Sequence, residues 1–185
     1  MGSPRRPRAV AVTGAIGAGK SEALKAFARH GAATISSDEI VHDLIERDPE
    51  VRAALTERFG TTDRGEIGRI VFADRAALDW LERLLHPRVL ERYADWYERQ
   101  DGALVVAEIP LLYETGGERR FDAVVVITAP EEVRRARASV PLAGRSERLI
   151  PDEEKVRRAD FAYVNDGTPE ELDEWVAGVV RSLSS

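Results

Sequence analysis

The feature that most restricts how this chain can fold is a short glycine-rich motif near its start. The motif reads Gly14-Ala15-Ile16-Gly17-Ala18-Gly19-Lys20-Ser21, and it matches the phosphate-binding pattern G-x-x-x-x-G-K-[ST]. An apolar run over residues 9–13 precedes it, and an amphipathic helical pattern follows it. A strand, a phosphate-binding loop and a helix in this order predict an α/β domain that binds a nucleotide.

The residue types of the motif suit the chemistry of polyphosphate binding. Glycines let backbone N–H groups approach phosphate oxygens, and the N-terminus of the next helix adds a favourable dipole. We expect Lys20 to hold the β- and γ-phosphates of ATP and the Ser21 hydroxyl to ligate Mg²⁺. The predicted nucleotide site is therefore residues 14–21 together with Glu22. The alternative is a glycine-rich turn that binds no ligand.

Short valine-rich runs alternate with amphipathic patterns along the rest of the chain, which is typical of a parallel sheet covered by helices. We expect strands at residues 9–13, 33–36, 104–109, 123–128 and 162–164. Helices are expected at residues 21–30, from 38, at 49–59, 74–85, 88–100 and 170–183, with a break at His86-Pro87. The predicted fold class is α/β, a three-layer α/β/α fold with a five-stranded parallel sheet.

Two segments do not belong to the expected alternation of strand and helix. Residues 37–102 are helical in pattern and exceed the roughly 10–12 residues that a crossover needs, so they predict a helical insertion. Residues 139–150 have weak periodicity and are expected to form a short lid. We expect residues 1–185 to form one domain, preceded by a disordered tail over residues 1–7.

Composition excludes several classes of protein. The net charge of −6 disfavours a broad nucleic-acid-binding surface. The absence of cysteine excludes disulfides and cysteine zinc sites and agrees with a reducing cytoplasm. No apolar run reaches the roughly 18 residues of a membrane span, and the stretch over residues 9–18 reads as strand and loop rather than as an export signal. We expect a cytoplasmic protein with a small-molecule partner; nothing in the sequence indicates its oligomeric state.

Several kinds of nucleotide-binding protein share this loop, and other residues separate them. A GTPase needs a D-x-x-G switch and an N-K-x-D element, and neither occurs; Asn165 is the only asparagine in the chain. A ring-forming motor ATPase needs a longer chain with a second subdomain. A small-molecule kinase remains as the predicted class.

Within that class, the chain resembles dephospho-coenzyme A kinases. The resemblance extends over blocks that follow the family's order along nearly the whole chain: residues 12–21, 27–32, 36–42, 63–64, 70–74, 81–87, 108–114, 153–155, 159–161 and 165–167. It implies a sheet with strand order 2-3-1-4-5 and transfer of phosphate from ATP to the ribose 3′-hydroxyl of dephospho-coenzyme A. The alternatives are another small kinase with this loop, such as a nucleoside monophosphate kinase, and a nucleotide-binding regulator without transfer activity.

The resemblance also assigns roles around the acceptor. Asp38 matches the catalytic carboxylate, which orients the attacking hydroxyl and accepts its proton; the alternative role is a helix N-cap. The family usually has a second aspartate two residues earlier, where this chain has Ser36. His86 is expected on the acceptor side, or else as part of a helix stop. Tyr113 and Glu114 are further candidates for acceptor contacts.

Further roles concern the metal, the lid and the adenine. Glu108 lies near the end of the expected strand over residues 104–109, where related enzymes often place an acidic residue near Mg²⁺. The alternative is a carboxylate that caps the next turn. Arg145 and Arg148 match lid arginines that reach the phosphates on closure. Asn165 and Gly167 match a loop that contacts adenine and otherwise form an ordinary turn. The lid is shorter than usual, and Leu149 replaces a common glutamine.

Overall fold

A computed structural model of the chain describes residues 6–137 and 150–184. The chain divides into two compact units, of which one contains the residues up to Ser36 and from Gln100 onward, and the other contains Ser37–Arg99. The expectation of a disordered tail over residues 1–7 is wrong for its last two residues. Arg6 forms an ion pair with Asp122 at 2.7 Å, and Pro7 is buried.

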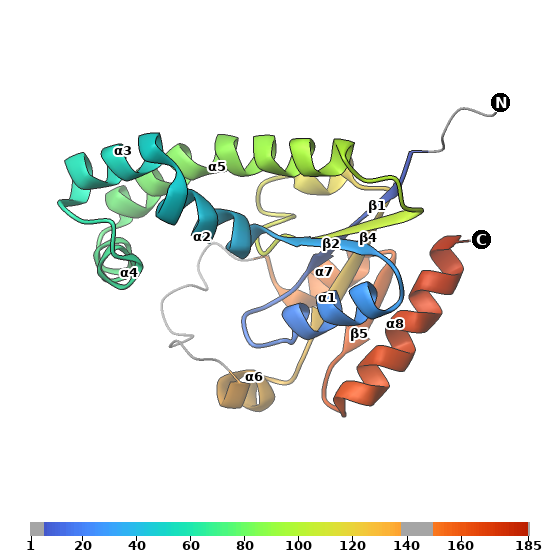
Figure 1. Cartoon of the computed structure of the whole chain (residues 1–185). Coiled ribbons are helices and arrows are strands. Elements are labelled where there is room, and N and C mark those ends of the chain that lie inside the picture. The colour runs from blue at the N-terminus through green and yellow to red at the C-terminus, as the bar shows by residue number, and fades with distance from the viewer. Residues whose placement is uncertain (1–5, 138–149, 185) are drawn as a thin grey trace. The chain divides into compact units, whose positions relative to one another are not determined.

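The first unit contains a five-stranded parallel sheet with the order β2-β3-β1-β4-β5, as predicted (Figure 1). Its strands are β1 (Arg8–Thr13), β2 (Ala33–Ser36), β3 (Leu104–Glu108), β4 (Ala123–Thr128) and β5 (Phe161–Val164). Because the strands are parallel, their carboxyl ends meet at one edge of the sheet, where ligands of such folds bind. The expected strands match these within one residue at each end.

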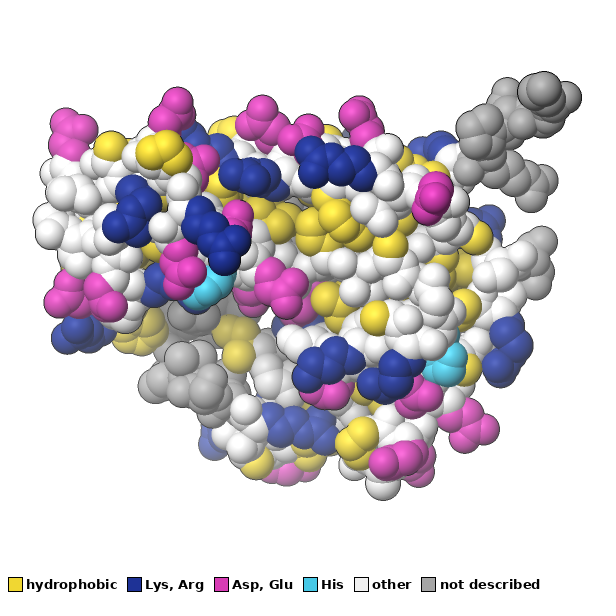
Figure 2. Space-filling view, in the orientation of Figure 1, with side chains coloured by type: hydrophobic (Ala, Val, Ile, Leu, Met, Phe, Trp, Pro, Cys, Tyr) yellow, Lys and Arg dark blue, Asp and Glu magenta, His cyan; other side chains and the backbone are white. Residues whose placement is uncertain are grey.

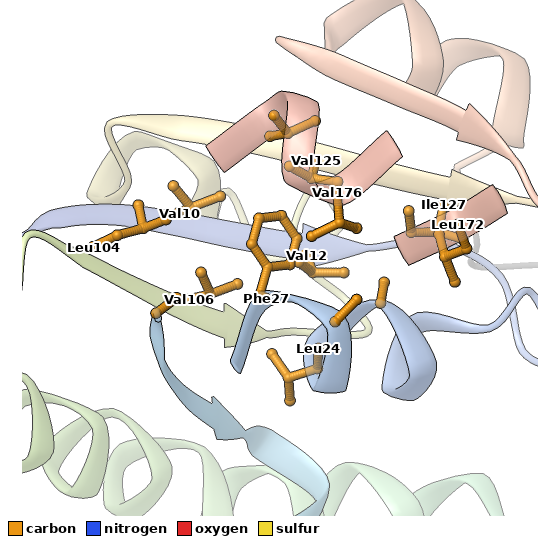
Figure 3. Packing of buried hydrophobic residues seen from close by; sticks show 14 of the residues in the cluster. Val10, Val12, Leu24, Phe27, Leu104, Val106, Val125, Ile127, Leu172 and Val176 are labelled. Atoms are coloured by element: carbon orange, nitrogen blue, oxygen red, sulfur yellow. The ribbon is translucent and has the colours of Figure 1, made fainter. Parts of the chain in front are cut away.

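Helices cover both faces of this sheet, which confirms the three-layer fold. On one face, α1 (Lys20–Arg29) packs beside α8 (Pro169–Ser184). Figure 3 shows Phe27 of α1 among Val12, Val106 and Val176, and these four side chains are fully buried. On the other face, Ala11, Val124 and Val126 contact the segment after β3, and α7 (Asp152–Arg158) contacts β4. Two further short helices are η1 (Gly117–Arg120) and α6 (Glu131–Arg137).

The second unit is entirely helical. It consists of α2 (Ser37–Arg47), α3 (Pro49–Phe59), α4 (Arg64–Ala73) and α5 (Arg75–Glu98). Asp48, Asp63 and Asp74 each accept hydrogen bonds from backbone N–H groups at the start of the following helix, as N-cap residues do. Figure 2 shows acidic and basic side chains interspersed on the exposed face of these helices.

The predicted break at His86-Pro87 is wrong, because α5 runs through both residues as one helix of 24 residues. A proline inside a helix cannot donate to the carbonyl four residues earlier and crowds it, at a cost of about 3 kcal/mol. Packing offsets this cost, since Leu85 is buried and α5 contacts both α2 and α4. Arg88 also donates to the carbonyl of Leu84 at 2.9 Å, which adds a hydrogen bond in the disturbed turn.

Within the two described stretches of chain, no helix combines the length and the apolar character that a membrane crossing requires.

Candidate active site

The phosphate-binding loop connects β1 to α1 at the carboxyl edge of the sheet. Gly14 has a φ of +142°, and a Cβ atom there would lie 1.9 Å from the carbonyl oxygen of Ile127 in β4. Gly17 has a φ of +77°, and its Cβ would lie 2.6 Å from the carbonyl oxygen of Arg134 in α6. Both positions therefore require glycine for two reasons, the backbone conformation and the close approach of a neighbouring backbone.

The end of this loop leaves the start of α1 open to an anion. Gly19 occupies the N-cap position in the left-handed conformation, and no side chain of the described residues caps the helix there. The first N–H groups of a helix lack partners within the helix and favour negative charge. Ser21 is exposed in this first turn, whereas Glu22 forms an ion pair with Lys25 at 2.7 Å. The first turn of α1 therefore presents N–H groups that no described side chain caps, together with the Ser21 hydroxyl.

The Lys20 ammonium is held inside the loop. Lys20 is only 9% exposed, and its Nζ donates to the carbonyl of Ala15 at 3.0 Å. The backbone N–H of Ala18 donates to the same carbonyl at 3.2 Å. A positive charge in this position can interact with phosphate oxygens bound by the surrounding N–H groups.

Two predicted carboxylates lie near the ends of strands. Glu108 is the last residue of β3, is 4% exposed, and pairs in register with Val12 of β1 and Ser36 of β2. Asp38 is exposed and is the second residue of α2, in the helical unit. Because α2 begins at Ser37, Asp38 lies inside the first turn and does not occupy the N-cap position.

The oxygen donors of the first unit fit Mg²⁺ by their chemistry. Mg²⁺ prefers oxygen ligands and usually combines one or two protein groups with phosphate oxygens and water. Ser21 supplies a hydroxyl and Glu108 a carboxylate. Over residues 6–137 and 150–184, no group of three or more His, Asp or Glu side chains is arranged to hold a metal. A Mg²⁺ ion bound here would therefore depend on the phosphates for part of its coordination.

Tyr113 and Glu114 are placed on the sheet face that α7 covers. Glu114 Oε1 accepts from Lys155 Nζ at 2.7 Å and from the Ile150 N–H at 3.2 Å. The guanidinium of Arg158 lies 4.3 Å from the centre of the Tyr113 ring, and burial raises the pKa of Tyr113. Tyr113 Oη and Glu114 Oε2 are buried without a hydrogen-bond partner among the residues described.

The remaining predicted residues divide into three groups. His86 is exposed on α5 in the helical unit. Gly167 is exposed in the loop before α8, where Thr168 and Glu171 exchange reciprocal capping hydrogen bonds. Arg145 and Arg148, with Leu149 and nearly all of the expected lid, lie outside the described residues.

Asn165 is the predicted nucleotide-site residue that the structure brings into direct contact with the phosphate loop. Its side-chain Nδ2 donates to the carbonyl of Ala18 at 2.9 Å. Two arginines of α6 also lie there, and no pattern in the sequence predicts them. Arg134 places its backbone against Gly17, and Arg137 donates to the Asn165 carbonyl at 3.0 Å. In an arginine-rich chain only the tertiary structure distinguishes these two residues from surface arginines.

Comparison with known proteins agrees with this geometry. Residues 8–171 match the family model described as Dephospho-CoA kinase. A dephospho-CoA kinase from Mesorhizobium japonicum is 42% identical over 164 residues, covering 81% of this chain and 83% of that protein. A crystal structure of a Thermus thermophilus protein superposes with a TM-score of 0.81 at 30% identity, covering 98% of this chain and all of that one. A Campylobacter jejuni dephospho-CoA kinase, 24% identical over 97% of this chain and 98% of its own, supports the fold with a TM-score of 0.66.

Proposed function

The chain belongs to the dephospho-CoA kinase family, whose function is ATP-dependent phosphorylation of dephospho-CoA, and we propose that it phosphorylates the ribose 3′-hydroxyl with the residues described above. The observation that carries the proposal is the phosphate loop. Its glycines are fixed by close backbone approaches, no side chain in the described part of the chain caps its helix N-terminus, and Lys20 is held inside it. Residues 14–22 bind the phosphates of ATP in this proposal.

Phosphoryl transfer then needs a group that receives the proton of the acceptor hydroxyl. The hydroxyl oxygen forms a bond to the γ-phosphorus, the bond from this phosphorus to the β–γ bridging oxygen breaks, and ADP leaves. Asp38 accepts the proton, a role for which an exposed carboxylate in a first helical turn is accessible. Lys20 stabilises the negative charge that develops on the transferred group.

Magnesium supplies charge neutralisation and orients the β- and γ-phosphates when it is bound. Ser21 and Glu108 are the residues that would hold it, on the chemistry of their oxygens. We assign no further step to the metal.

The helical unit Ser37–Arg99 is proposed to bind dephospho-CoA, as an insertion within a single domain of residues 1–185. His86 contributes to this binding, and Tyr113 and Glu114 are proposed as further acceptor contacts on the family resemblance. Asn165 and Gly167 belong to the loop proposed to contact adenine. Arg145 and Arg148 are proposed to reach the phosphates from the segment over residues 139–150, and we propose a cytoplasmic location.

The test is identification of the product. Purified protein is incubated with ATP, Mg²⁺ and, in separate reactions, dephospho-CoA, nucleoside monophosphates or shikimate. We expect phosphate transfer only to dephospho-CoA, with the new phosphate on the 3′-oxygen as determined by phosphorus NMR. Faster transfer to another acceptor would identify a different small-molecule kinase, and ATP binding without transfer to any acceptor would identify a regulator.

A further inference from the structure

Asn165 is the single asparagine of the chain and is 5% exposed. It follows β5, and it hydrogen-bonds to three separate segments. Its backbone N–H donates to the carbonyl of Thr128 at the end of β4, at 2.7 Å. Its carbonyl accepts from Arg137 of α6 at 3.0 Å, and its side-chain Nδ2 donates to the carbonyl of Ala18 at 2.9 Å. One buried residue therefore ties the phosphate loop to a strand and to a helix.

The bond to Ala18 has a direct consequence for the orientation of the phosphate loop. In a trans peptide unit the C=O and the following N–H point in opposite directions, and this chain has no cis peptide among its described residues. The Asn165 carboxamide holds the Ala18 carbonyl toward itself, so the N–H of Gly19 must point away from Asn165. That N–H belongs to the residue that precedes the first turn of α1, where an anion binds.

The absence of a side chain at Gly19 leaves the space that this contact needs. A Cβ atom on Gly19 would lie 2.1 Å from Asn165 Nδ2, closer than any real contact, and the φ of +99° already disfavours other residues. The carboxamide therefore occupies the space that the missing side chain leaves. Asn165 and Ala18 are both buried, and Ala18 is fully inaccessible. Loss of the Asn165 donor would therefore leave the buried Ala18 carbonyl without a hydrogen bond to replace its lost hydration.

We propose that Asn165 is a positioning residue for phosphate binding: its carboxamide fixes the Ala18–Gly19 peptide so that the Gly19 N–H faces the phosphates. Arg137 supports this arrangement by holding the Asn165 carbonyl. The inference rests on the proposed binding of ATP at this loop. It differs from an adenine contact, because it places the effect of Asn165 on the phosphates of the nucleotide and not on the base.

The experiment separates these two roles with a ligand that has no base. Binding of ATP and of inorganic tripolyphosphate is measured by calorimetry for the wild type, Asn165→Asp and Asn165→Ala. Loss of a hydrogen bond to a buried carbonyl corresponds to a decrease in affinity of about 10- to 100-fold. We expect both ligands to lose the same factor, with the KM for dephospho-CoA unchanged.

Two further variants complete the design. Arg137→Gln removes the supporting bond while leaving Asn165 in place, and we expect a smaller loss of affinity that is again equal for ATP and tripolyphosphate. Asp166→Asn changes the exposed neighbour of Asn165 and serves as the matched control, with unchanged affinities. The melting temperature of each variant reports whether the protein is folded.

Four outcomes would overturn the inference. A fall in the affinity for ATP with an unchanged affinity for tripolyphosphate would establish an adenine contact. A lower melting temperature with unchanged affinities would show a role in stability alone. Wild-type protein that binds ATP but not tripolyphosphate would show that contacts to the phosphates do not contribute to affinity. Unchanged affinities in all variants would show that Asn165 has no role in the site. Wild-type protein that binds no ATP would instead contradict the proposed function.

Discussion

The sheet unit and the helical unit of this kinase differ in what holds their candidate functional groups in place. In the sheet unit, Val10 and Val12 face one helical layer and Ala11 faces the other, so β1 is buried on both sides. The phosphate loop that follows β1 is fixed by backbone contacts. In the helical unit, by contrast, Asp38 and His86 are exposed side chains on helices. Under the proposed function, this difference predicts a preorganised site for ATP and an acceptor site completed by side chains that remain accessible.

The largest effect is expected from the core of the sheet unit. Phe27 is fully buried against β1 and α8, and Phe27→Ala should lower the free energy of unfolding by about 3–5 kcal/mol. Because Phe27 lies on α1 together with Lys20, ATP affinity should fall as well. The matched variant Leu55→Ala removes a fully buried side chain from the helical unit and should leave ATP affinity unchanged. Calorimetry measures the ATP affinity, and urea unfolding measures the free energy of unfolding. Equal loss of ATP affinity in the two variants would contradict the difference drawn between the two units.

A loss of catalysis without loss of fold is expected from Lys20→Ala. Removal of one preorganised charge from the phosphates typically lowers kcat by about 10²–10³. The melting temperature should change little, because the apolar residues of α1 that pack in the core, such as Phe27, stay in place. Steady-state kinetics at saturating ATP provide the measurement, with Lys25→Ala on the exposed face of α1 as the control. Turnover near that of the wild type would contradict the assignment of the loop.

A smaller effect is expected at the start of α5. Asp74 accepts from the N–H groups of Ala76 and Ala77 at 2.8 and 3.3 Å, and loss of such a cap costs about 1 kcal/mol. Asp74→Ala should therefore lower the melting temperature modestly and raise the KM for dephospho-CoA, because α5 carries His86. The same substitution at Asp95, an exposed aspartate within α5, is the matched control. A change in the KM for ATP instead would show that the helical unit also shapes the donor site.

The smallest effect concerns a surface contact between α1 and α8. The hydrogen bond from Arg29 holds the pKa of Asp173 below its ordinary value, and His30 Nε2 donates to the other carboxylate oxygen at 3.0 Å. A lowered pKa in the folded state stabilises the protein above the ordinary pKa of about 3.9, and this contribution disappears as the pH falls through the lower folded-state value. Asp173→Asn should thus be less stable than the wild type at pH 7. This difference in the free energy of unfolding should shrink below about pH 4. Urea unfolding of both proteins across that pH range provides the measurement, and a difference that stays constant with pH would contradict the role of the pair.

The comparison also explains which features could be predicted from the sequence. The strands of the sheet unit were predictable because they are apolar at consecutive positions, as in Val124–Val126. The phosphate loop was predictable because its glycines are required by local geometry. The sheet order followed from the family resemblance. These features depend on short stretches of chain or on a pattern that the whole family shares.

Features that depend on tertiary packing were not predictable in the same way. Pro87 indicated a helix break, and packing of α5 on two neighbouring helices overrides that local preference. Arg137 acts near the loop only because α6 places it beside Asn165, and Lys155 is buried only because Glu114 lies opposite it. In each case the partner lies more than 20 positions away in the sequence or on another element, so no local pattern records it.

The measurement that tests the division of roles most directly is a parallel determination of ATP affinity and turnover in Asp38→Asn. Asparagine keeps the size of the side chain but cannot accept the proton, and loss of a general base typically lowers the rate by about 10²–10⁴. The account predicts that kcat falls by at least 10²-fold, while the Kd for ATP and the melting temperature stay at the wild-type values. Retained turnover, or an ATP affinity that falls in parallel with turnover, would contradict it.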